Sequence, residues 1–163
     1  MEGYEIKTGY EKVTIVSPAP AVKEDLTDEI RKTMIEEALA VLPQSYAPFS
    51  HYNVAAAVLM SSGKIYTGVN IESALLSCTI CAERNAIFHA AARGERKIIA
   101  IAVVGGIDCK LTDYCTPCGV CRQVMRDFAR PDDMYIICAK SPEDYIERTL
   151  GEMLPESFGP ETL

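Results

Sequence analysis

The spacing of apolar residues along the chain predicts helices that alternate with short strands. Between residues 26 and 42, apolar side chains recur at every fourth position, the period of one helix face, at Leu26, Ile30, Met34, Ala38 and Leu42. Pro43 then ends this helix. The apolar segments at residues 51–60 and 64–70 are separated by a short turn that contains glycine, and they predict two paired strands.

The second half of the chain continues this alternation. An alanine-rich segment at residues 79–92 predicts a helix that approaches a sheet closely, because its side chains are small. The apolar run at 97–106 predicts a central strand, a helix follows at 119–129, and residues 134–139 predict a further strand. A Ser-x-x-Asp capping pattern predicts a last helix over residues 141–154. Helices interleaved with short apolar strands favour one mixed sheet covered on both faces.

The first 22 residues are predicted to form an extension or surface arm, and residues 23–163 a single domain with its own core. Partial alternation at residues 4–16 predicts an edge strand or a hairpin, and the proline-containing segment 17–22 predicts an extended linker. No apolar run reaches membrane-spanning length, and the N-terminus lacks a basic-then-apolar signal pattern. We therefore expect an intracellular, cytoplasmic protein without a membrane partner.

Charge and cysteine content narrow the possible functions. The formal net charge of −7 opposes a phosphate backbone, and no stripe of Lys and Arg offsets it. A small neutral substrate or a protein partner is therefore favoured over nucleic acid. The seven cysteines are an odd number in a chain expected to occupy a reducing compartment. Metal binding or catalysis is thus favoured over a disulfide framework.

The clustered cysteines predict a metal site, because soft thiolates select zinc or iron–sulfur clusters. A closed structural zinc site would use Cys78, Cys81, Cys118 and Cys121. A run of Cys115, Cys118 and Cys121 is similar to part of a ferredoxin motif, but the fourth cysteine and its proline are missing. The third set, Cys81, Cys118 and Cys121, leaves the fourth zinc position to water.

The flanking residues favour the third set. Deaminases that hydrolyse an amino group from a nucleobase carry a His or Cys, a Glu two residues later, and then Pro-Cys-x-x-Cys. Cys81, Glu83 and residues 117–121 fit this pattern. The cysteines fall in the first turns of two predicted helices, where the partial positive charge favours thiolate. Arg84 and Arg122 flank the ligands, and we expect one or both, Arg84 foremost, to donate hydrogen bonds to thiolate sulfurs.

At these residues the chain resembles the small, homotetrameric, zinc-dependent cytidine deaminases. The resemblance covers most of residues 26–163 and rests on five segments, YAPFSHYNVAAAVL, GKIYTGVNIE, ICAERNAIFHA, PCGVCRQVMRDFA and LPESFGPETL. It implies a three-layer α/β/α fold around a mixed sheet of about five strands. It also implies one zinc ion per subunit and a homotetramer whose pockets are completed across subunit contacts.

The resemblance assigns roles to the matching residues. Cys81, Cys118 and Cys121 match the zinc ligands, and Glu83 matches the proton shuttle. The residues matched to substrate binding are Asn70 and Glu72 at the ribose hydroxyls, Tyr52 against the pyrimidine ring with Phe49 nearby, Ala82, and Phe158, which reaches from the tail towards a neighbouring subunit's site.

The implied activity is hydrolytic deamination of cytidine and deoxycytidine to uridine and deoxyuridine in pyrimidine salvage. Two alternatives stay open. One is a deaminase of another aminopyrimidine such as blasticidin S, against which the ribose-reading Glu72 argues; the other is a non-catalytic module stabilised by a four-cysteine zinc site. The residues at Tyr52, Ala55 and Leu76 depart from the family pattern, so fine substrate preference stays open. If the site is open, Cys78 is expected to be a packed side chain just before the helix.

Overall fold

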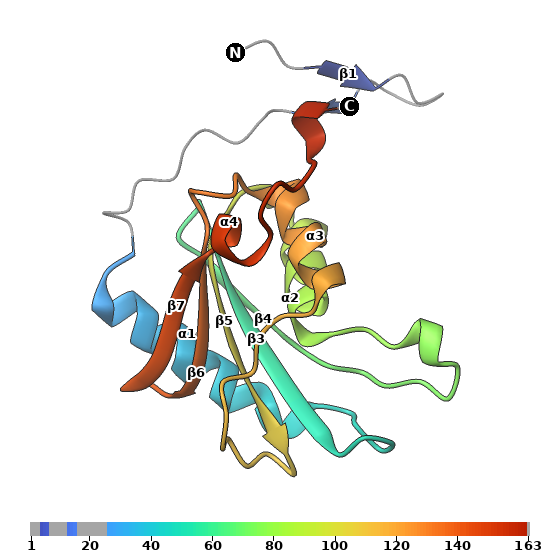
Figure 1. The fold of residues 1–163 in the computed structure, drawn as a ribbon, viewed down its shortest axis with the longest axis vertical. Helices are drawn as coiled ribbons and strands as arrows, with labels where there is room; N and C mark the ends of the chain where they lie inside the picture. Colours follow the sequence, from blue (N-terminus) through green and yellow to red (C-terminus); the bar gives the residue numbers. More distant parts are fainter. Residues whose placement is uncertain (1–3, 7–12, 16–25, 163) are drawn as a thin grey trace.

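A five-stranded mixed sheet forms the centre of the computed structural model, which describes residues 4–6, 13–15 and 26–162 (Figure 1). The strands are β3 (Tyr52–Met60), β4 (Ile65–Val69), β5 (Ile98–Ile107), β6 (Tyr135–Ser141) and β7 (Asp144–Thr149). Their order is β4-β3-β5-β6-β7. Only β5 and β6 pair in parallel within this sheet, and the other neighbours are antiparallel. The predicted mixed sheet is confirmed.

Helices cover both faces of this sheet, as predicted. The helices are α1 (Asp28–Val41), α2 (Ala82–Ala92), α3 (Gly119–Phe128) and α4 (Leu150–Met153), with 3₁₀ turns η2 (Leu42–Gln44), η3 (Leu76–Cys78) and η4 (Pro160–Thr162). α1 lies on one face of the sheet, and α2 and α3 lie on the other (Figure 1). α1 buries Met34 and Ile35 in one core cluster, whereas α2 and α3 bury Ala86 and Met125 in a second cluster. None of the helices in the described ranges is long and apolar enough to cross a membrane.

The N-terminal residues that the structure describes form a small sheet of their own. β1 (Tyr4–Ile6) pairs antiparallel with β2 (Val13–Ile15), which agrees with the hairpin, one of the two alternatives predicted for this segment. The linker predicted at residues 17–22 lies outside the described residues. The division of the chain at residue 22 stays a prediction.

The helix predicted over residues 141–154 is wrong, because residues Asp144–Thr149 form strand β7 and only Leu150–Met153 are α-helical. The hydroxyl of Ser141 does not cap a helix: it accepts hydrogen bonds from the backbone N–H groups of Glu143 (3.2 Å) and Asp144 (3.1 Å) and so closes the turn between β6 and β7. The capping box lies later, where Thr149 and Glu152 bond reciprocally at the start of the one-turn helix α4. Hydrogen bonds from backbone N–H groups to a hydroxyl oxygen therefore stabilise two different structures here, the turn at Ser141 and the start of the short helix α4.

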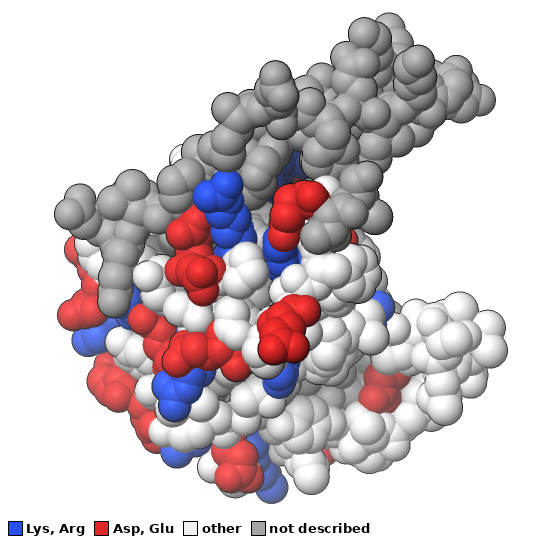
Figure 2. Space-filling view, turned by 45° about the horizontal axis from the view of Figure 1, so that its top comes forward, with Lys and Arg blue, Asp and Glu red and all other residues white. Residues whose placement is uncertain are grey.

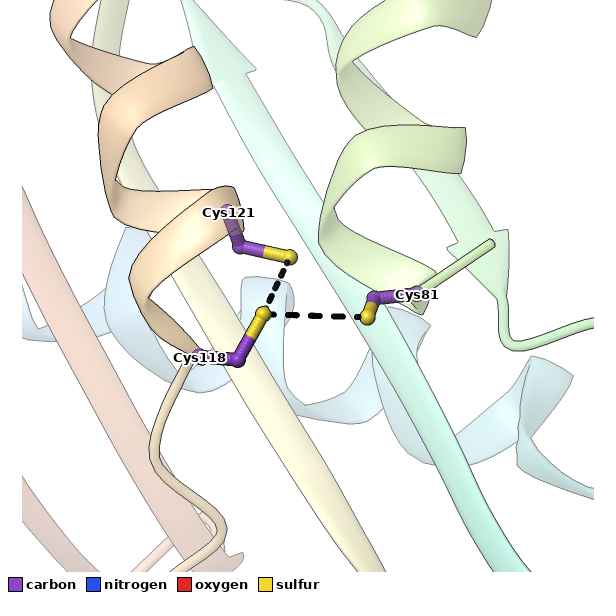
Figure 3. Close-up of side chains that lie close together, drawn as sticks. All are labelled: Cys81, Cys118 and Cys121. Carbon is purple, nitrogen blue, oxygen red and sulfur yellow. Dashed lines mark hydrogen bonds between the residues drawn. The ribbon is translucent and has the colours of Figure 1, made fainter. Parts of the chain in front are cut away.

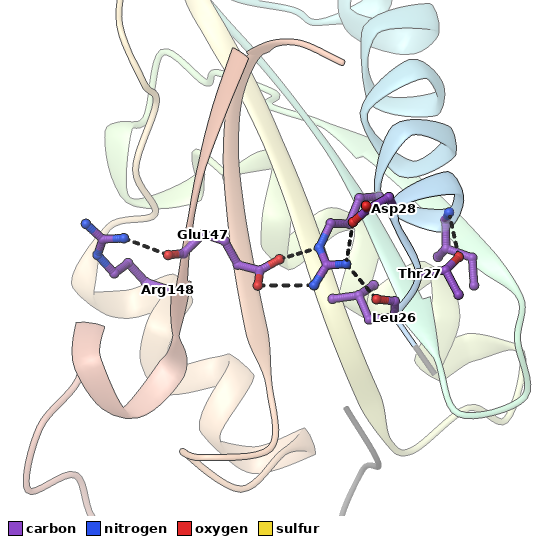
Figure 4. A network of polar contacts seen from close by, with 7 residues as sticks. Leu26, Thr27, Asp28, Glu147 and Arg148 are labelled. Atoms are coloured by element: carbon purple, nitrogen blue, oxygen red, sulfur yellow. Dashed lines mark hydrogen bonds and ion pairs between the residues drawn. The ribbon is translucent and has the colours of Figure 1, made fainter. Parts of the chain in front are cut away.

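Arg31, near the start of α1, forms an ion pair with Glu147 of the edge strand β7, one of the residues labelled in Figure 4. Its Nε atom donates to Oε2 of Glu147 at 2.6 Å, and its NH1 nitrogen donates to the carbonyl oxygen of Leu26, also at 2.6 Å. The hydrogen bond to the Glu147 carboxylate raises the pKa of the Arg31 guanidinium above its usual value. The beginning of the core domain is thereby held against the sheet.

Helix α2 lies unusually close to strand β4, and a glycine makes this approach possible. A Cβ atom added to Gly68 would lie 2.3 Å from the backbone nitrogen of Ala86 and 2.7 Å from the carbonyl oxygen of Ala82. The side chain of Asn85 also donates to the Val69 carbonyl oxygen at 3.0 Å. The backbone of the alanine-rich helix α2 therefore lies directly against the backbone of β4. This is the close approach to the sheet that its small side chains predicted.

We expect Gly68→Ala to destabilise the protein by about 1–3 kcal/mol, because the new methyl group meets backbone atoms that only a shift of α2 can relieve. Urea unfolding monitored by circular dichroism measures this change. Gly119→Ala is the matched control, since its Cβ would meet nothing within 4 Å. Equal stability of the Gly68→Ala and wild-type proteins would show that α2 has room to move.

Candidate active site

Three cysteines meet where the N-termini of α2 and α3 face each other (Figure 3). Cys81 is the N-cap of α2, Cys118 is the N-cap of α3, and Cys121 lies in the first turn of α3. Neither N-cap side chain accepts a capping hydrogen bond from the backbone N–H groups of its own helix, although a residue at this position usually does so. The sulfur atoms are therefore available to a metal, at helix ends whose partial positive charge favours thiolates.

The spacing of the sulfur atoms fits a tetrahedral zinc ion. The Sγ atoms of Cys81 and Cys118 are 3.9 Å apart, those of Cys118 and Cys121 are 3.5 Å apart, and all three lie within 4.8 Å of one another. Zn–S bonds of about 2.3 Å in a tetrahedron place sulfurs about 3.8 Å apart. Three thiolates and an open fourth position are the donor set of a catalytic rather than a structural zinc site. The predicted open set is thus brought together by the fold.

Arg84 directs its guanidinium at this cluster, as predicted. Its NH2 nitrogen donates to Sγ of Cys81 at 3.4 Å and to the Thr79 carbonyl oxygen at 3.3 Å. Its Nε atom is buried and has no hydrogen-bond partner among the described residues. A hydrogen bond from Cys121, followed by Arg84, lowers the pKa of the Cys81 thiol to about 5 against the effect of burial. Arg84 therefore favours the charged form of a metal ligand.

We expect Arg84→Gln to weaken zinc binding about 10–100-fold, because the Cys81 thiolate loses its cationic donor and protons then compete better with the metal. Competition with a chromogenic chelator measures the zinc affinity. Arg96→Gln is the control, since Arg96 is exposed and donates to the backbone carbonyl oxygens of Ala91 and Glu95. If both variants hold zinc equally well, the contact between Arg84 and the sulfur contributes nothing.

Glu83 lies beside the cysteine cluster without belonging to it. It is the second residue of α2, and only 4% of its surface is exposed. Burial raises the pKa of its carboxyl group, the charge of Cys81 raises it further, and a hydrogen bond from Cys121 opposes both. A buried carboxylic acid whose pKa is raised towards neutrality is suited to take up and release a proton next to an open metal position.

Cys115, which the sequence offered only as part of a ferredoxin-like set, lies outside the metal cluster but beside this site. Burial raises the pKa of its thiol to about 11, with a smaller contribution from the charge of Glu83, and its thiol interacts with the Tyr52 hydroxyl. A Cβ on Gly105 of β5 would lie 3.1 Å from the Cys115 sulfur, so this glycine makes room for the thiol. Tyr52, Cys115 and Glu83 thus lie near one another. The only local signal was the three-residue spacing from Cys115 to Cys118.

The residues expected at the ribose follow β4 and are held by hydrogen bonds to the backbone and, for Glu72, also to the Ser50 hydroxyl. The side chain of Asn70 accepts from the Val54 N–H and donates to the Tyr52 carbonyl oxygen, both at 2.9 Å. Glu72 accepts from the N–H of Phe49 at 2.9 Å and from the hydroxyl of Ser50 at 2.5 Å. These hydrogen bonds, that of Ser50 first, lower the pKa of the Glu72 carboxyl group. Both side chains are therefore fixed in orientation.

The other residues expected at or near the site differ in burial and in hydrogen-bond partners. Ala82 is buried as the first residue of α2, whereas Phe158 is 63% exposed on the C-terminal segment. Arg122 donates to the carbonyl oxygens of Pro117 and Met153, both at 2.7 Å, so it braces the loop before Cys118 instead of contacting a sulfur. The expectation that Cys78 is packed is wrong, because its side chain is exposed at the end of η3.

An open three-thiolate site with a buried, non-ligating glutamate defines the class as zinc-dependent hydrolytic deaminases. Residues 28–138 match the family described as the cytidine and deoxycytidylate deaminase zinc-binding region. A cytidine deaminase of Halalkalibacterium halodurans is 40% identical over 133 residues, which cover 82% of this chain and 97% of the relative. This chain belongs to the cytidine deaminase family.

Solved structures of the family share the fold. The crystal structure of cytidine deaminase from Burkholderia pseudomallei superimposes with a TM-score of 0.70 at 37% sequence identity, covering 77% of this chain and 97% of that one. The enzyme from Mycobacterium tuberculosis gives a TM-score of 0.65 at 30% identity over 78% of this chain and 95% of that one. The likeness therefore extends over nearly the whole length of these relatives.

Proposed function

We propose that this protein hydrolyses the exocyclic amino group of cytidine and deoxycytidine, giving uridine or deoxyuridine and ammonia. The observation that carries the proposal is the juxtaposition of buried Glu83 with the Cys81, Cys118 and Cys121 sulfurs at two facing helix N-termini. A four-cysteine structural site is disfavoured, since the described cluster consists of three cysteines and Cys78 is exposed outside it.

The chain's own residues supply the proton transfers of this reaction. Zinc, when held by the three thiolates, lowers the pKa of a water molecule and so supplies the nucleophile for C4 of the base. Glu83 accepts the proton that this water loses and delivers it to the ring nitrogen N3. The same carboxylate then takes the proton of the hydroxyl group now bound to C4 and passes it to the departing amine, which leaves as ammonia while C4 becomes the carbonyl carbon of the product. Burial raises the pKa of this carboxyl group, which favours proton uptake.

The substrate would lie between the helix N-termini and the start of β3. Tyr52, the first residue of β3, offers an aromatic face for the pyrimidine, with Phe49 and Ala82 as further contacts. Asn70 and Glu72 would hold the ribose hydroxyls in the orientations that their backbone contacts impose. The negative charge of Glu72 also repels a phosphorylated sugar, so we expect a nucleoside to be preferred over a nucleotide.

We further propose a cytoplasmic homotetramer that acts in pyrimidine salvage. Several large apolar side chains are exposed on the single chain, a pattern typical of surfaces that a partner covers, among them Phe49, Leu75, Leu76, Val120 and Phe158. On the face shown in Figure 2, acidic and basic side chains intermingle over the described residues beside a broad uncharged area. The described part of this face has no continuous basic band for nucleic acid.

Ammonia release from a substrate panel tests the proposed function. We expect the zinc-loaded protein to deaminate cytidine and deoxycytidine, and to leave dCMP, cytosine, adenosine and blasticidin S unchanged. Activity on blasticidin S but not on cytidine would assign the site to another aminopyrimidine. If a protein with bound zinc released no ammonia from any of the six compounds, the catalytic proposal would be overturned.

A further inference from the structure

The helix that carries two of the three metal ligands also holds the C-terminal segment. Within α3, Arg122 donates to the Met153 carbonyl oxygen at 2.7 Å, and the side chain of Gln123 donates to the Phe158 carbonyl oxygen at 3.2 Å. One turn further along, Arg126 contacts the same segment. The C-terminal segment is therefore held along the same short helix whose first turn carries the metal ligands Cys118 and Cys121.

Arg126 is the centre of this attachment. Only 5% of its surface is exposed, which is rare for an arginine and requires compensating partners. Its Nε atom donates to the Ser157 hydroxyl at 3.3 Å, NH1 donates to the Ala129 carbonyl oxygen at 3.4 Å, and NH2 forms an ion pair with Glu161. The guanidinium group is thus covered by the segment that it binds.

Gly159 permits the close contact between the C-terminal segment and the Arg126 guanidinium group. A Cβ atom added to Gly159 would lie 2.3 Å from Cζ of Arg126 and within 2.5 Å of both terminal nitrogens. The backbone of residue 159 therefore rests directly on the guanidinium plane, with Ser157 and Glu161 bonded on either side. Phe158 lies in the middle of this clamped stretch, and its side chain stays 63% exposed.

We propose that Arg126 is a positioning residue that fixes residues 157–161 on α3 and so sets where Phe158 projects towards the substrate site of a second copy of the chain. This inference rests on the proposed function, in which Phe158 contacts the nucleoside across a subunit boundary. Arg126 itself touches neither substrate nor metal. Its loss frees the segment and weakens substrate binding, while Glu83 and the three metal ligands keep their places.

Steady-state kinetics with cytidine separate this role from a general structural one. Arg126→Gln is expected to raise KM about 10-fold or more while kcat changes less than about 3-fold and zinc content stays unchanged. Phe158→Ala should give the same split, and the double variant should be no worse than Phe158→Ala alone, because both changes remove one interaction. Additive effects on KM in the double variant would overturn the proposal.

Further variants distinguish the loss of the Arg126 contact from a general loss of structure. Gly159→Ala keeps Arg126 but places a methyl group against its guanidinium, so it is expected to reproduce the rise in KM. Arg126→Lys, which keeps the charge facing Glu161, should recover part of the affinity. Arg148→Gln is the matched control, since Arg148 is exposed and donates to the carbonyl oxygen of Glu147, and it should leave KM unchanged. A normal KM in Gly159→Ala would count against the proposal.

A fluorescence measurement tests the attachment independently of activity. The chain contains eight tyrosines but no tryptophan, so Phe158→Trp introduces a single tryptophan that is excited selectively at wavelengths where tyrosine does not absorb. Adding Arg126→Gln is expected to increase quenching of this emission by acrylamide and to shift the emission, whereas Arg148→Gln changes neither. Unchanged quenching would overturn the attachment. If the protein proved inactive on cytidine, the proposed function would fail while this measurement would still decide the role of Arg126.

Discussion

Replacing Glu83 with Gln is expected to lower kcat for cytidine about 10⁴-fold while the protein keeps its fold and its zinc. The amide has nearly the same shape as the carboxyl group but neither accepts nor delivers a proton at neutral pH. Glu83 is buried beside the cysteine cluster and is not one of the three sulfur ligands. Its loss therefore removes the proton transfers and leaves the metal site intact.

Three measurements on the Glu83→Gln protein check this expectation together. Ammonia release gives kcat, metal analysis gives the zinc content, and thermal unfolding gives the stability. The melting temperature should not fall, because an amide costs less to bury than a carboxylate. Glu37→Gln, an exposed site on α1, serves as the control and should retain full activity. A Glu83→Gln enzyme with a near-normal rate would show that another group moves the proton.

The candidate metal site could be predicted because its parts are local motifs. Cys81 and Glu83 are two residues apart, and Cys118 and Cys121 are three residues apart, so each pair occupies one helix start. The two motifs are joined only by the fold, across a separation of 37 residues between Cys81 and Cys118. Each local pattern alone is a weak signal, and their combination in one chain sufficed to predict an assembly that neither pattern encodes alone.

The approach of Cys115 to Tyr52 and Glu83 could not be predicted in this way. It depends on the antiparallel register of β3 and β5, in which Tyr52 lies opposite Ile107, and on the missing side chain at Gly105. Neither the register nor a single glycine contact produces a periodic signal. Side-chain proximity across a sheet is set by tertiary packing, so the sequence pattern carries no trace of it.

The error at residues 141–154 has a different physical origin. A serine hydroxyl followed by free backbone N–H groups satisfies a helix start and a tight turn equally well. Strand β6 already runs up to Ser141, and the sheet edge offers Tyr145 and Ile146 a partner in β6 that an isolated helix lacks. Hydrogen bonding between β6 and β7 therefore determines the structure of this segment more than the local capping pattern does. Only Leu150–Met153 form an α-helix, α4.

The second large effect is expected at the metal ligands. Cys118→Ser should lower zinc affinity at least about 100-fold and abolish ammonia release, because a neutral hydroxyl replaces one of three thiolates. The sulfur of Cys118 lies close to both of the others, 3.9 Å from that of Cys81 and 3.5 Å from that of Cys121. Removing it leaves a pair of thiolates that cannot enclose the ion.

Cys78→Ser is the matched change that separates an open site from a closed one. Cys78 precedes Cys81 by the spacing of a zinc-binding pair, yet its side chain is exposed and lies outside the cluster. Zinc content and kcat should therefore equal those of the wild type in this variant, measured by metal analysis after dialysis and by ammonia release. Zinc loss as large as that of Cys118→Ser would mean that a fourth thiolate closes the site. No position would then remain for water, and the catalytic interpretation of the whole cluster would fail with it.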